Sequence, residues 1–164
     1  MGFGSIGQLT ARLARALGVT VVAYDPALPA DSSVYAEHQV TPLSLDALLQ
    51  QADVVSLHMP LLDSTRNLFD AQRLATMKPG AVLINTARGG IVDEVALASA
   101  LRSGQLSGAA VDVFAQEPLP AAPHFVDCPN LILTPHIAGL TVESNERVSS
   151  LVADKVLQAL AKLA

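Results

Sequence analysis

Short apolar runs alternate with helical patterns along this chain, and that alternation constrains the fold more than any other feature. Runs typical of strands lie at residues 19–25, 54–57, 81–85, 109–113 and 131–133. Helical patterns lie between them, at residues 6–17, 45–52, 70–76 and 94–103. The strand runs are continuously apolar, as is typical of strands covered on both faces. The sequence therefore predicts an α/β fold with a doubly wound parallel sheet.

The ends of the predicted helices carry the residues that usually begin and stop helices. Ser44, Asp70 and Asp93 are predicted to cap helix N-termini through their side chains. Gly18 and Gly104 stand where helices are expected to stop. The proline-rich segment 116–130 is predicted to be a loop, and no repeat or linker divides the chain.

A long helix is predicted after Thr141, and its pattern is still running at the last residue. One stripe of this helix is apolar and consists of Val148, Leu151, Val152, Ala159, Leu160 and Leu163. Hydrophobic residues make up 51% of the chain. Because no apolar run approaches the roughly 18 residues of a membrane span, the sequence predicts an apolar face for a neighbouring chain or domain.

Charge and cysteine content exclude several classes of function. The formal net charge is −5 and no Lys/Arg cluster is present, so a nucleic-acid partner is not expected. No secretory signal pattern or membrane span is found, and Cys128, the one cysteine, is interpreted as an inert loop thiol in a reducing compartment. We therefore expect a cytoplasmic protein. No His, Cys or Asp cluster has metal-ligand spacing, so no metal is expected.

The opening stretch MGFGSIGQLTARLARALG contains a G-x-G-x-x-G fingerprint at Gly2, Gly4 and Gly7. Gly2 allows the tight turn, Gly4 lets the backbone approach a pyrophosphate, and Gly7 lets the helix pack closely on the sheet. The N–H groups at the start of the helix, near Ser5 and Ile6, are then expected to hold the anion.

Asp25 closes the first apolar run and strengthens this interpretation. An acid at the end of that strand accepts hydrogen bonds from the adenosine ribose hydroxyls. The alternative is a carboxylate that caps the turn YDPALP. No arginine lies close by to pair with a 2′-phosphate, so the sequence favours NAD over NADP.

Arg88, Glu117 and His136 each follow a different predicted strand. Ligands of open α/β sheets bind at the carboxyl ends of the strands, so these side chains are expected to converge beside a nicotinamide. Taken singly, they also fit a surface ion-pair partner, a loop carboxylate and a capping imidazole. The remaining histidines are interpreted as surface residues at His38 and His124, and the role of His58 is left open.

Several stretches resemble the D-isomer-specific 2-hydroxyacid dehydrogenase family. They are the glycine turn, LHMPLLDSTRNLFD, MKPGAVLINTARGGIVDEVAL, GAAVDVFAQEP and TPHIAG, in the family's order. The resemblance implies a Rossmann-type domain that binds NAD and an enzyme that interconverts a 2-hydroxy acid and its 2-keto acid. A non-catalytic NAD(H)-sensing corepressor is the alternative, and formate dehydrogenase is disfavoured because Glu117 stands where it typically has Gln.

The resemblance also implies a role for each site residue. Arg88 would bind the substrate carboxylate, His136 would exchange a proton with the substrate oxygen, and Glu117 would orient His136 and favour its charged form. Asp112 would contact the nicotinamide end of the cofactor. Further cofactor contacts are expected at Pro60, Thr65, Thr86, Ala87, Arg88, His136 and Gly139.

Family members carry a substrate-binding domain and a first strand before the glycine turn, whereas only Met1 precedes Gly2 here. The expectation is that residues 1–164 form the NAD-binding domain of a larger enzyme, without its substrate domain and first strand. That strand would lie in the middle of the sheet. The resemblance also implies a homodimer that pairs through this domain and its long helix.

Overall fold

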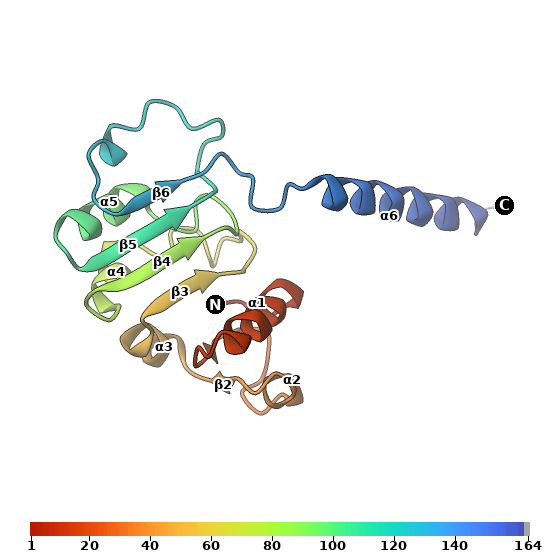
Figure 1. Ribbon diagram of the computed structural model, residues 1–164, viewed down its shortest axis with the longest axis horizontal. Helices are drawn as coiled ribbons and strands as arrows, with labels where there is room; N and C mark the ends of the chain where they lie inside the picture. The colour runs from red at the N-terminus through yellow and green to blue at the C-terminus, as the bar shows by residue number, and fades with distance from the viewer. Residues whose placement is uncertain (163–164) are drawn as a thin grey trace.

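The predicted parallel sheet consists of two hydrogen-bonded pieces in the computed structural model, which describes residues 1–162 (Figure 1). The smaller piece pairs β1 (Val22–Ala23) with β2 (Thr41–Pro42). The larger contains, in spatial order, β3 (Val54–Leu57), β4 (Ala81–Asn85), β5 (Leu106–Val111) and β6 (Leu131–Leu133). All pairings are parallel, which confirms the predicted α/β class.

Helices connect these strands, as the alternation predicts. They are α1 (Ser5–Ala16), α2 (Ser33–Glu37), α3 (Leu45–Gln51), α4 (Ala71–Thr76), α5 (Glu94–Arg102), the 3₁₀ turn η1 (Pro123–Phe125) and α6 (Val142–Ala161). In Figure 1, α4 and α5 lie behind the larger sheet piece and α1 lies in front, between β3 and β2. The three predicted caps are confirmed, since the side chains of Ser44, Asp70 and Asp93 each accept a bond from a backbone N–H of the first turn.

The first two residues lie between the two sheet pieces. The Met1 amino group donates to the Ser56 carbonyl at 2.9 Å, and the His58 N–H donates to the Met1 carbonyl at 2.8 Å. On the other side, the Gly2 N–H donates to the Tyr24 carbonyl at 2.9 Å. The backbone of Met1 and Gly2 thus connects β1 to β3 at the place where the resemblance puts the family's first strand, which is expected to be missing here.

Some predicted boundaries are wrong. The run 19–25 contains only the two-residue β1, because its regular ladder is limited to two residue pairs with the equally short β2. The run 109–113 becomes β5, which begins at Leu106, since Ser107 and Gly108 hide the start of the strand from an apolar pattern. The elements α2, β2 and η1 are absent from the sequence-based predictions, because each has only two to five residues and carries no periodic apolar pattern.

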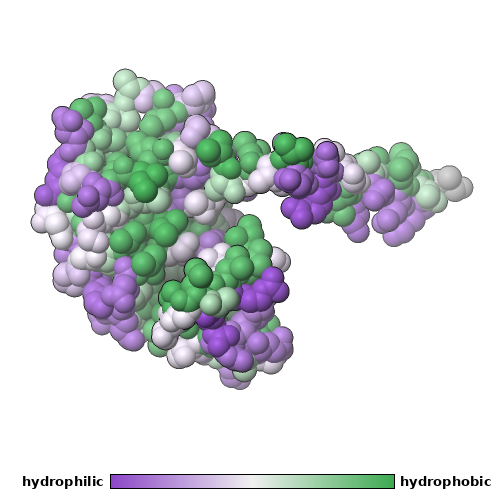
Figure 2. Space-filling view, viewed as in Figure 1, coloured by the Kyte–Doolittle hydropathy of each residue, from purple (hydrophilic) through white to green (hydrophobic). Residues whose placement is uncertain are grey.

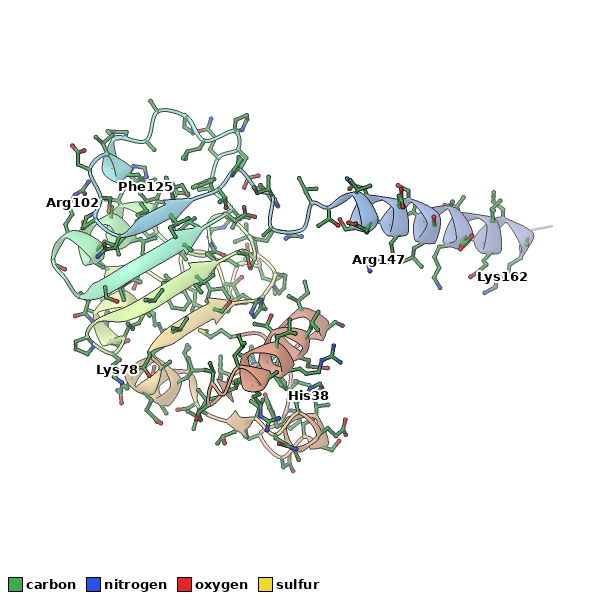
Figure 3. All side chains as sticks on the ribbon, in the orientation of Figure 1. His38, Lys78, Arg102, Phe125, Arg147 and Lys162 are labelled. Carbon is green, nitrogen blue, oxygen red and sulfur yellow. The ribbon has the colours of Figure 1, made fainter. Side chains whose placement is uncertain are left out.

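The main hydrophobic core lies around the larger sheet piece and includes Phe69, Leu83 and Leu97, each almost completely buried. A smaller core under β1 and α2 centres on the stacked rings of Phe3 and Tyr35, 5.1 Å apart. Figure 3 shows the side chains of both regions on the ribbon.

Helix α6 projects away from the rest of the molecule and has no buried residue (Figures 1 and 2). Val148, Leu151, Val152 and Leu160 of the predicted stripe are all more than half exposed. Leu163, the last member of the stripe, lies outside the described residues. Within residues 1–162, no helix combines the length and apolarity that crossing a membrane requires.

Candidate active site

Asn85 shapes the turn that carries Arg88. It ends β4, is 1% exposed, and is one of the few buried polar residues in the described chain. Its side-chain oxygen accepts a bond from the Ala87 N–H at 3.1 Å, and its amide donates to the Arg88 carbonyl at 3.1 Å. A buried amide must be hydrogen-bonded to be tolerated, so Asn85 and this turn fix one another. Asn85 is absent from the predicted site residues, although a lone polar residue at the end of an apolar run is a signal that points to it.

Asp112 plays the matching part after β5. Its carboxylate is 3% exposed and accepts bonds from the Thr134 hydroxyl, the Ile137 N–H and the Ala138 N–H, the two amides at 2.9 Å. Burial alone would raise the pKa of Asp112, but these hydrogen bonds outweigh it and hold the pKa below its ordinary value. Asp112 therefore organises the loop that contains His136.

The backbone at His136 is strained. Its φ of +54° lies in the left-handed region, which is uncommon for residues other than glycine, although histidine adopts it more often than most residues do. Such a conformation costs of order 1 kcal/mol or more and persists only where the surroundings hold it. The bonds from Asp112 to the next two amides provide that support.

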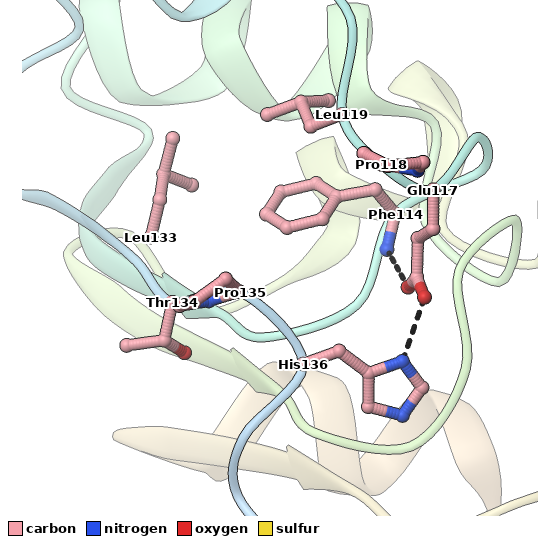
Figure 4. Close-up of a pocket in the computed structure, with 8 residues that line it drawn as sticks. All are labelled: Phe114, Glu117, Pro118, Leu119, Leu133, Thr134, Pro135 and His136. Carbon is pink, nitrogen blue, oxygen red and sulfur yellow. Dashed lines mark hydrogen bonds and ion pairs between the residues drawn. The ribbon is translucent and has the colours of Figure 1, made fainter.

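Glu117 and His136 form a hydrogen-bonded pair at the carboxyl end of the sheet (Figure 4). The His136 Nδ1 lies 2.7 Å from one Glu117 oxygen, and the Phe114 N–H donates to the other at 2.9 Å. The pKa of Glu117 lies below its ordinary value, mainly because of the hydrogen bond from His136 and secondly because of the bond from the Phe114 N–H. An ionised carboxylate can only accept, so Nδ1 carries the proton and Nε2 is left to exchange one with a ligand.

Arg88 lies on the turn beside this pair but does not bond to it within the described chain. Its guanidinium is exposed and donates to the Ala87 carbonyl at 2.6 Å. The turn and the Glu117 segment are nevertheless in direct backbone contact at Gly89. A Cβ at Gly89 would lie 1.7 Å from the Phe114 carbonyl oxygen, so only glycine fits. The structure thus brings the three predicted catalytic side chains to one edge, with only Glu117 and His136 in contact.

A pocket of about 770 Å³ opens beside the Glu117–His136 pair. Its walls are mostly apolar and consist of Phe114, Glu117, Pro118, Leu119, Leu133, Thr134, Pro135 and His136 (Figure 4). The polar groups of this pair therefore face a cavity large enough for a small organic ligand.

The three glycines of the fingerprint differ in what surrounds them. Gly2 has φ +78°, and a Cβ there would lie 2.5 Å from the His58 carbonyl oxygen. A Cβ at Gly7 would lie 2.2 Å from the Gly2 carbonyl oxygen. At Gly4 a Cβ would have no heavy atom within 4 Å. Packing explains the glycines at positions 2 and 7, whereas the space at Gly4 is free for a ligand.

Helix α1 begins at Ser5 directly after Gly4, with no side-chain cap on its first turn. Amide donors at an uncapped helix start attract anionic groups such as a pyrophosphate. The exposed Ser5 and Ile6 lie in this first turn, as predicted. These features fit the binding of the phosphates of a dinucleotide.

Asp25 connects the glycine turn to the end of β1. One oxygen accepts from the Phe3 N–H at 2.7 Å, and the other accepts from the Ala27 N–H at 2.9 Å. The second bond is the turn cap that the sequence analysis offered as an alternative to ribose binding. Both roles are compatible, since a carboxylate has about four acceptor sites.

The other predicted cofactor contacts follow the strands of the larger piece. They are Pro60 and Thr65 after β3, Thr86 and Ala87 after β4, and Gly139 after β6. Thr65 stabilises its own loop, because its hydroxyl donates to the Pro60 carbonyl at 2.8 Å. All of them lie at the carboxyl side of the sheet, and Ala87 accepts the Arg88 guanidinium bond through its carbonyl.

The remaining histidines are more buried than a surface position implies. His38 is partly buried and packs edge-on against the Phe3 ring at 5.7 Å, because the loop folds over the small core. His124 is partly buried against Phe125, with ring centroids 4.3 Å apart. Both histidines are thus only partly exposed at the surface.

His58, whose role was left open, bonds to the Ser56 hydroxyl at 3.0 Å. Burial, and secondly the charge of the chain's amino terminus, lower the pKa of His58 to about 4. It is therefore neutral at pH 7.

The Cys128 thiol is half-buried and donates weakly to the Ala98 carbonyl. Among residues 1–162, no group of three or more His, Cys, Asp or Glu side chains could hold a metal ion.

Comparisons with known proteins agree with this geometry. Residues 1–138 match the model of the D-isomer specific 2-hydroxyacid dehydrogenase, NAD binding domain. An (S)-sulfolactate dehydrogenase of Chromohalobacter salexigens is 52% identical over 160 residues, which are 98% of this chain and 52% of that protein. A D-3-phosphoglycerate dehydrogenase of Mycobacterium leprae is 44% identical, over 98% of this chain and 30% of its own length.

Solved structures give the same result. A D-lactate dehydrogenase from Sporolactobacillus sp. superposes with a TM-score of 0.84 at 40% identity, over 97% of this chain and 51% of its own. The NAD complexed form of a Lactobacillus delbrueckii D-isomer specific 2-hydroxyacid dehydrogenase gives a TM-score of 0.81 at 34% identity, over 98% of this chain and 51% of its own. The chain thus spans about half the length of these relatives, or less. The chain belongs to the D-isomer specific 2-hydroxyacid dehydrogenase family, and it corresponds to the family's NAD binding domain.

Proposed function

We propose that this chain is the coenzyme domain of an NAD-dependent oxidoreductase that interconverts a D-2-hydroxy acid and its 2-keto acid. The observation that carries the proposal is the Glu117–His136 pair, 2.7 Å apart, at the same sheet edge as the glycine turn. A histidine whose Nδ1 is held by an ionised carboxylate is the usual way to present Nε2 for proton transfer.

The residues at the other end of the edge fit NAD. The open position at Gly4 leaves room for a pyrophosphate, and the uncapped start of α1 supplies donors for it. Asp25 retains acceptor capacity for ribose hydroxyls and would repel a 2′-phosphate. Pro60, Thr65, Thr86, Ala87, Asp112 and Gly139 are the further cofactor contacts of this proposal.

The chain's own residues then divide the remaining work. Bound NAD(H) supplies or accepts the hydride. His136 donates a proton from Nε2 to the substrate oxygen during reduction and takes it back during oxidation. Arg88 is exposed and can turn its planar guanidinium toward the substrate carboxylate and bind both oxygens. Glu117 keeps the imidazole in the required tautomer.

We propose that residues 1–164 form this coenzyme domain and that a separate substrate domain completes the active site. The proposal is supported by the exposure of both Arg88 and His136, which face solvent and not a closed cavity. The named relatives act on sulfolactate, phosphoglycerate and lactate, so the substrate class is a small 2-hydroxy acid with a carboxylate for Arg88 to bind.

A homodimer formed through this domain is the further part of the proposal. Figure 2 shows hydrophobic surface across α1 and along one side of α6. Leu13 of α1 and Leu17 directly after it are more than half exposed, as are Val148 and Leu160 of α6. Burial of such surface stabilises by about 25 cal/mol per Å² and favours self-association.

A cytoplasmic location is also proposed, because a single cysteine is typical of proteins in a reducing compartment.

The test is turnover of the 2-keto acids that correspond to sulfolactate, phosphoglycerate, glycerate and lactate, with NADH, by a longer protein that contains these residues. We expect reduction of at least one, with His136→Ala lowering kcat far more than KM and Arg88→Ala also raising KM. The 164-residue chain alone should show little or no turnover, because nothing closes over its site to exclude water. Failure of the longer protein on all four acids would contradict the assigned activity, and turnover by the chain alone would contradict the division into domains.

A further inference from the structure

The loop between β5 and β6 carries Glu117, and its first residues are held by two carboxylates. The Phe114 N–H donates to Glu117 itself at 2.9 Å. The next amide, that of Ala115, donates to Glu94 Oε1 at 2.8 Å. Glu94 is the first residue of α5, so a helix outside the candidate site holds the backbone two residues before Glu117.

The second oxygen of Glu94 faces a later part of the same loop. Glu94 Oε2 lies 3.4 Å from His124 Nε2, and these side chains are only 17% and 24% exposed. The His124 Nε2 is buried and makes no aligned hydrogen bond within the described chain. The Glu94 carboxylate is thus the acidic group that this nitrogen faces.

Helix α5 also holds the far side of the loop from its other end. Arg102 donates to the carbonyls of His124 and Val126, at 2.7 and 2.9 Å. Figure 3 labels Arg102 next to Phe125, on the side of the molecule where the loop returns to β6. The loop is therefore fastened to α5 both where it leaves β5 and where it approaches β6.

Glu94 is not needed to cap its own helix. Asp93 is the N-cap of α5 and already accepts a bond from the Ala96 N–H at 2.9 Å. The Glu94 side chain reaches instead to the Ala115 amide and the His124 ring. We propose that Glu94 is a positioning residue, which holds the 114–117 segment so that the Glu117 carboxylate faces His136. This inference rests on the function proposed above for that pair.

The test uses the 164-residue chain without cofactor or substrate, so its outcome does not depend on whether the chain is a dehydrogenase. Glu94→Asp keeps the negative charge at the helix start but shortens the side chain by one methylene, too short to reach Ala115. Glu94→Gln keeps the length and an oxygen that can accept from the Ala115 N–H. Asp46→Ala is the control. Like Glu94, Asp46 is an acid in the first turn of a helix, in this case α3, and its carboxylate lies 3.3 Å from the Arg73 guanidinium.

Amide hydrogen exchange and the titration of the Glu117 carboxyl carbon are measured by NMR in each variant. In Glu94→Asp, exchange at Ala115 should accelerate by roughly tenfold or more, as expected for the loss of a hydrogen bond to a charged acceptor. Exchange at Phe114 should also accelerate, and the pKa of Glu117 should rise toward its ordinary value. Glu94→Gln should restore both readouts, and Asp46→Ala should leave them unchanged.

A role for Glu94 in stability alone predicts a different result. The melting temperature would fall in the Glu94 variants, while Phe114 exchange and the Glu117 titration would match the parent chain. That pattern in Glu94→Asp would overturn the proposal. Failure of Glu94→Gln to restore the Ala115 amide would overturn it as well, because the side chain's reach would then not be what matters.

Discussion

Replacement of Gly4 by alanine separates the binding role of the glycine turn from its structural role. An added Cβ at Gly4 meets no heavy atom within 4 Å, and the backbone there, with φ −75°, is one that alanine adopts easily. Alanine caps a helix less well than glycine by roughly 0.5 kcal/mol or more, but it also lowers the entropy of the unfolded chain by a similar amount. The free energy of unfolding should therefore change by less than about 1 kcal/mol.

The expected effect of Gly4→Ala on NADH binding is much larger. The methyl group would occupy the space through which the backbone approaches the pyrophosphate. The Kd for NADH should rise by at least about tenfold, which corresponds to roughly 1.4 kcal/mol. Calorimetric titration with NADH gives the Kd, and thermal unfolding gives the stability of the same samples.

Gly7→Ala is the matched comparison. Its Cβ would lie 2.2 Å from the Gly2 carbonyl oxygen, so backbone has to move to accept it. Overpacking of this kind costs about 1–3 kcal/mol, or about 2–4 °C of melting temperature for each kcal/mol in a chain of this length. Two results would refute the reasoning. One is an NADH affinity that Gly4→Ala leaves unchanged, and the other is a larger loss of stability in Gly4→Ala than in Gly7→Ala.

Three further outcomes follow from the same geometry. The chain should prefer NADH to NADPH by at least about tenfold, and equal affinities by calorimetry would show that Asp25 does not repel the 2′-phosphate. Because the pKa of Asp112 is lowered in the folded chain, its ionised carboxylate stabilises the fold above pH 3.8, its ordinary pKa, and this stabilisation is lost as the pH falls through the pKa of the folded state. The difference in melting temperature between the parent chain and Asp112→Asn should therefore shrink from pH 7 to pH 3. A difference that stays constant over this range would contradict the prediction. The chain should self-associate at micromolar concentration in sedimentation experiments. Leu151→Glu on α6 should raise the dissociation constant of this association by roughly tenfold or more, because burial of a leucine side chain contributes about 1.5–3 kcal/mol. A well-folded monomer of the parent chain would contradict the proposed interface.

The regular elements of the larger sheet piece could be predicted because their signals are local. The strands 54–57, 81–85 and 131–133 have the predicted bounds, and the helix caps at Ser44, Asp70 and Asp93 are confirmed. The short β1 and β2 depend on one another for hydrogen bonds, which the sequence of either alone does not reveal. The predicted strand 19–25 is therefore longer than the two-residue strand that forms.

The site was predictable in its residue types but not in its connections. The sequence pointed to Arg88, Glu117 and His136, while the carboxylate bonds of Asp112 became visible only in three dimensions. Asp112 accepts from residues 22 to 26 positions further along the chain. Contacts at such separation depend on how the strands order in the sheet, so no local pattern encodes them.

The most direct test of the account maps the binding of NADH onto the backbone of the 164-residue chain by NMR. The account predicts that NADH shifts the amides of Ser5 and Ile6 at the start of α1, the amide of Asp25, and the amides of the Thr86–Arg88 turn. These groups belong to the start of α1, the end of β1 and the turn after β4, so their joint response would place a single dinucleotide along the edge that they share. Shifts confined to another surface, or no shifts at a concentration of NADH that saturates relatives of the family, would contradict the account.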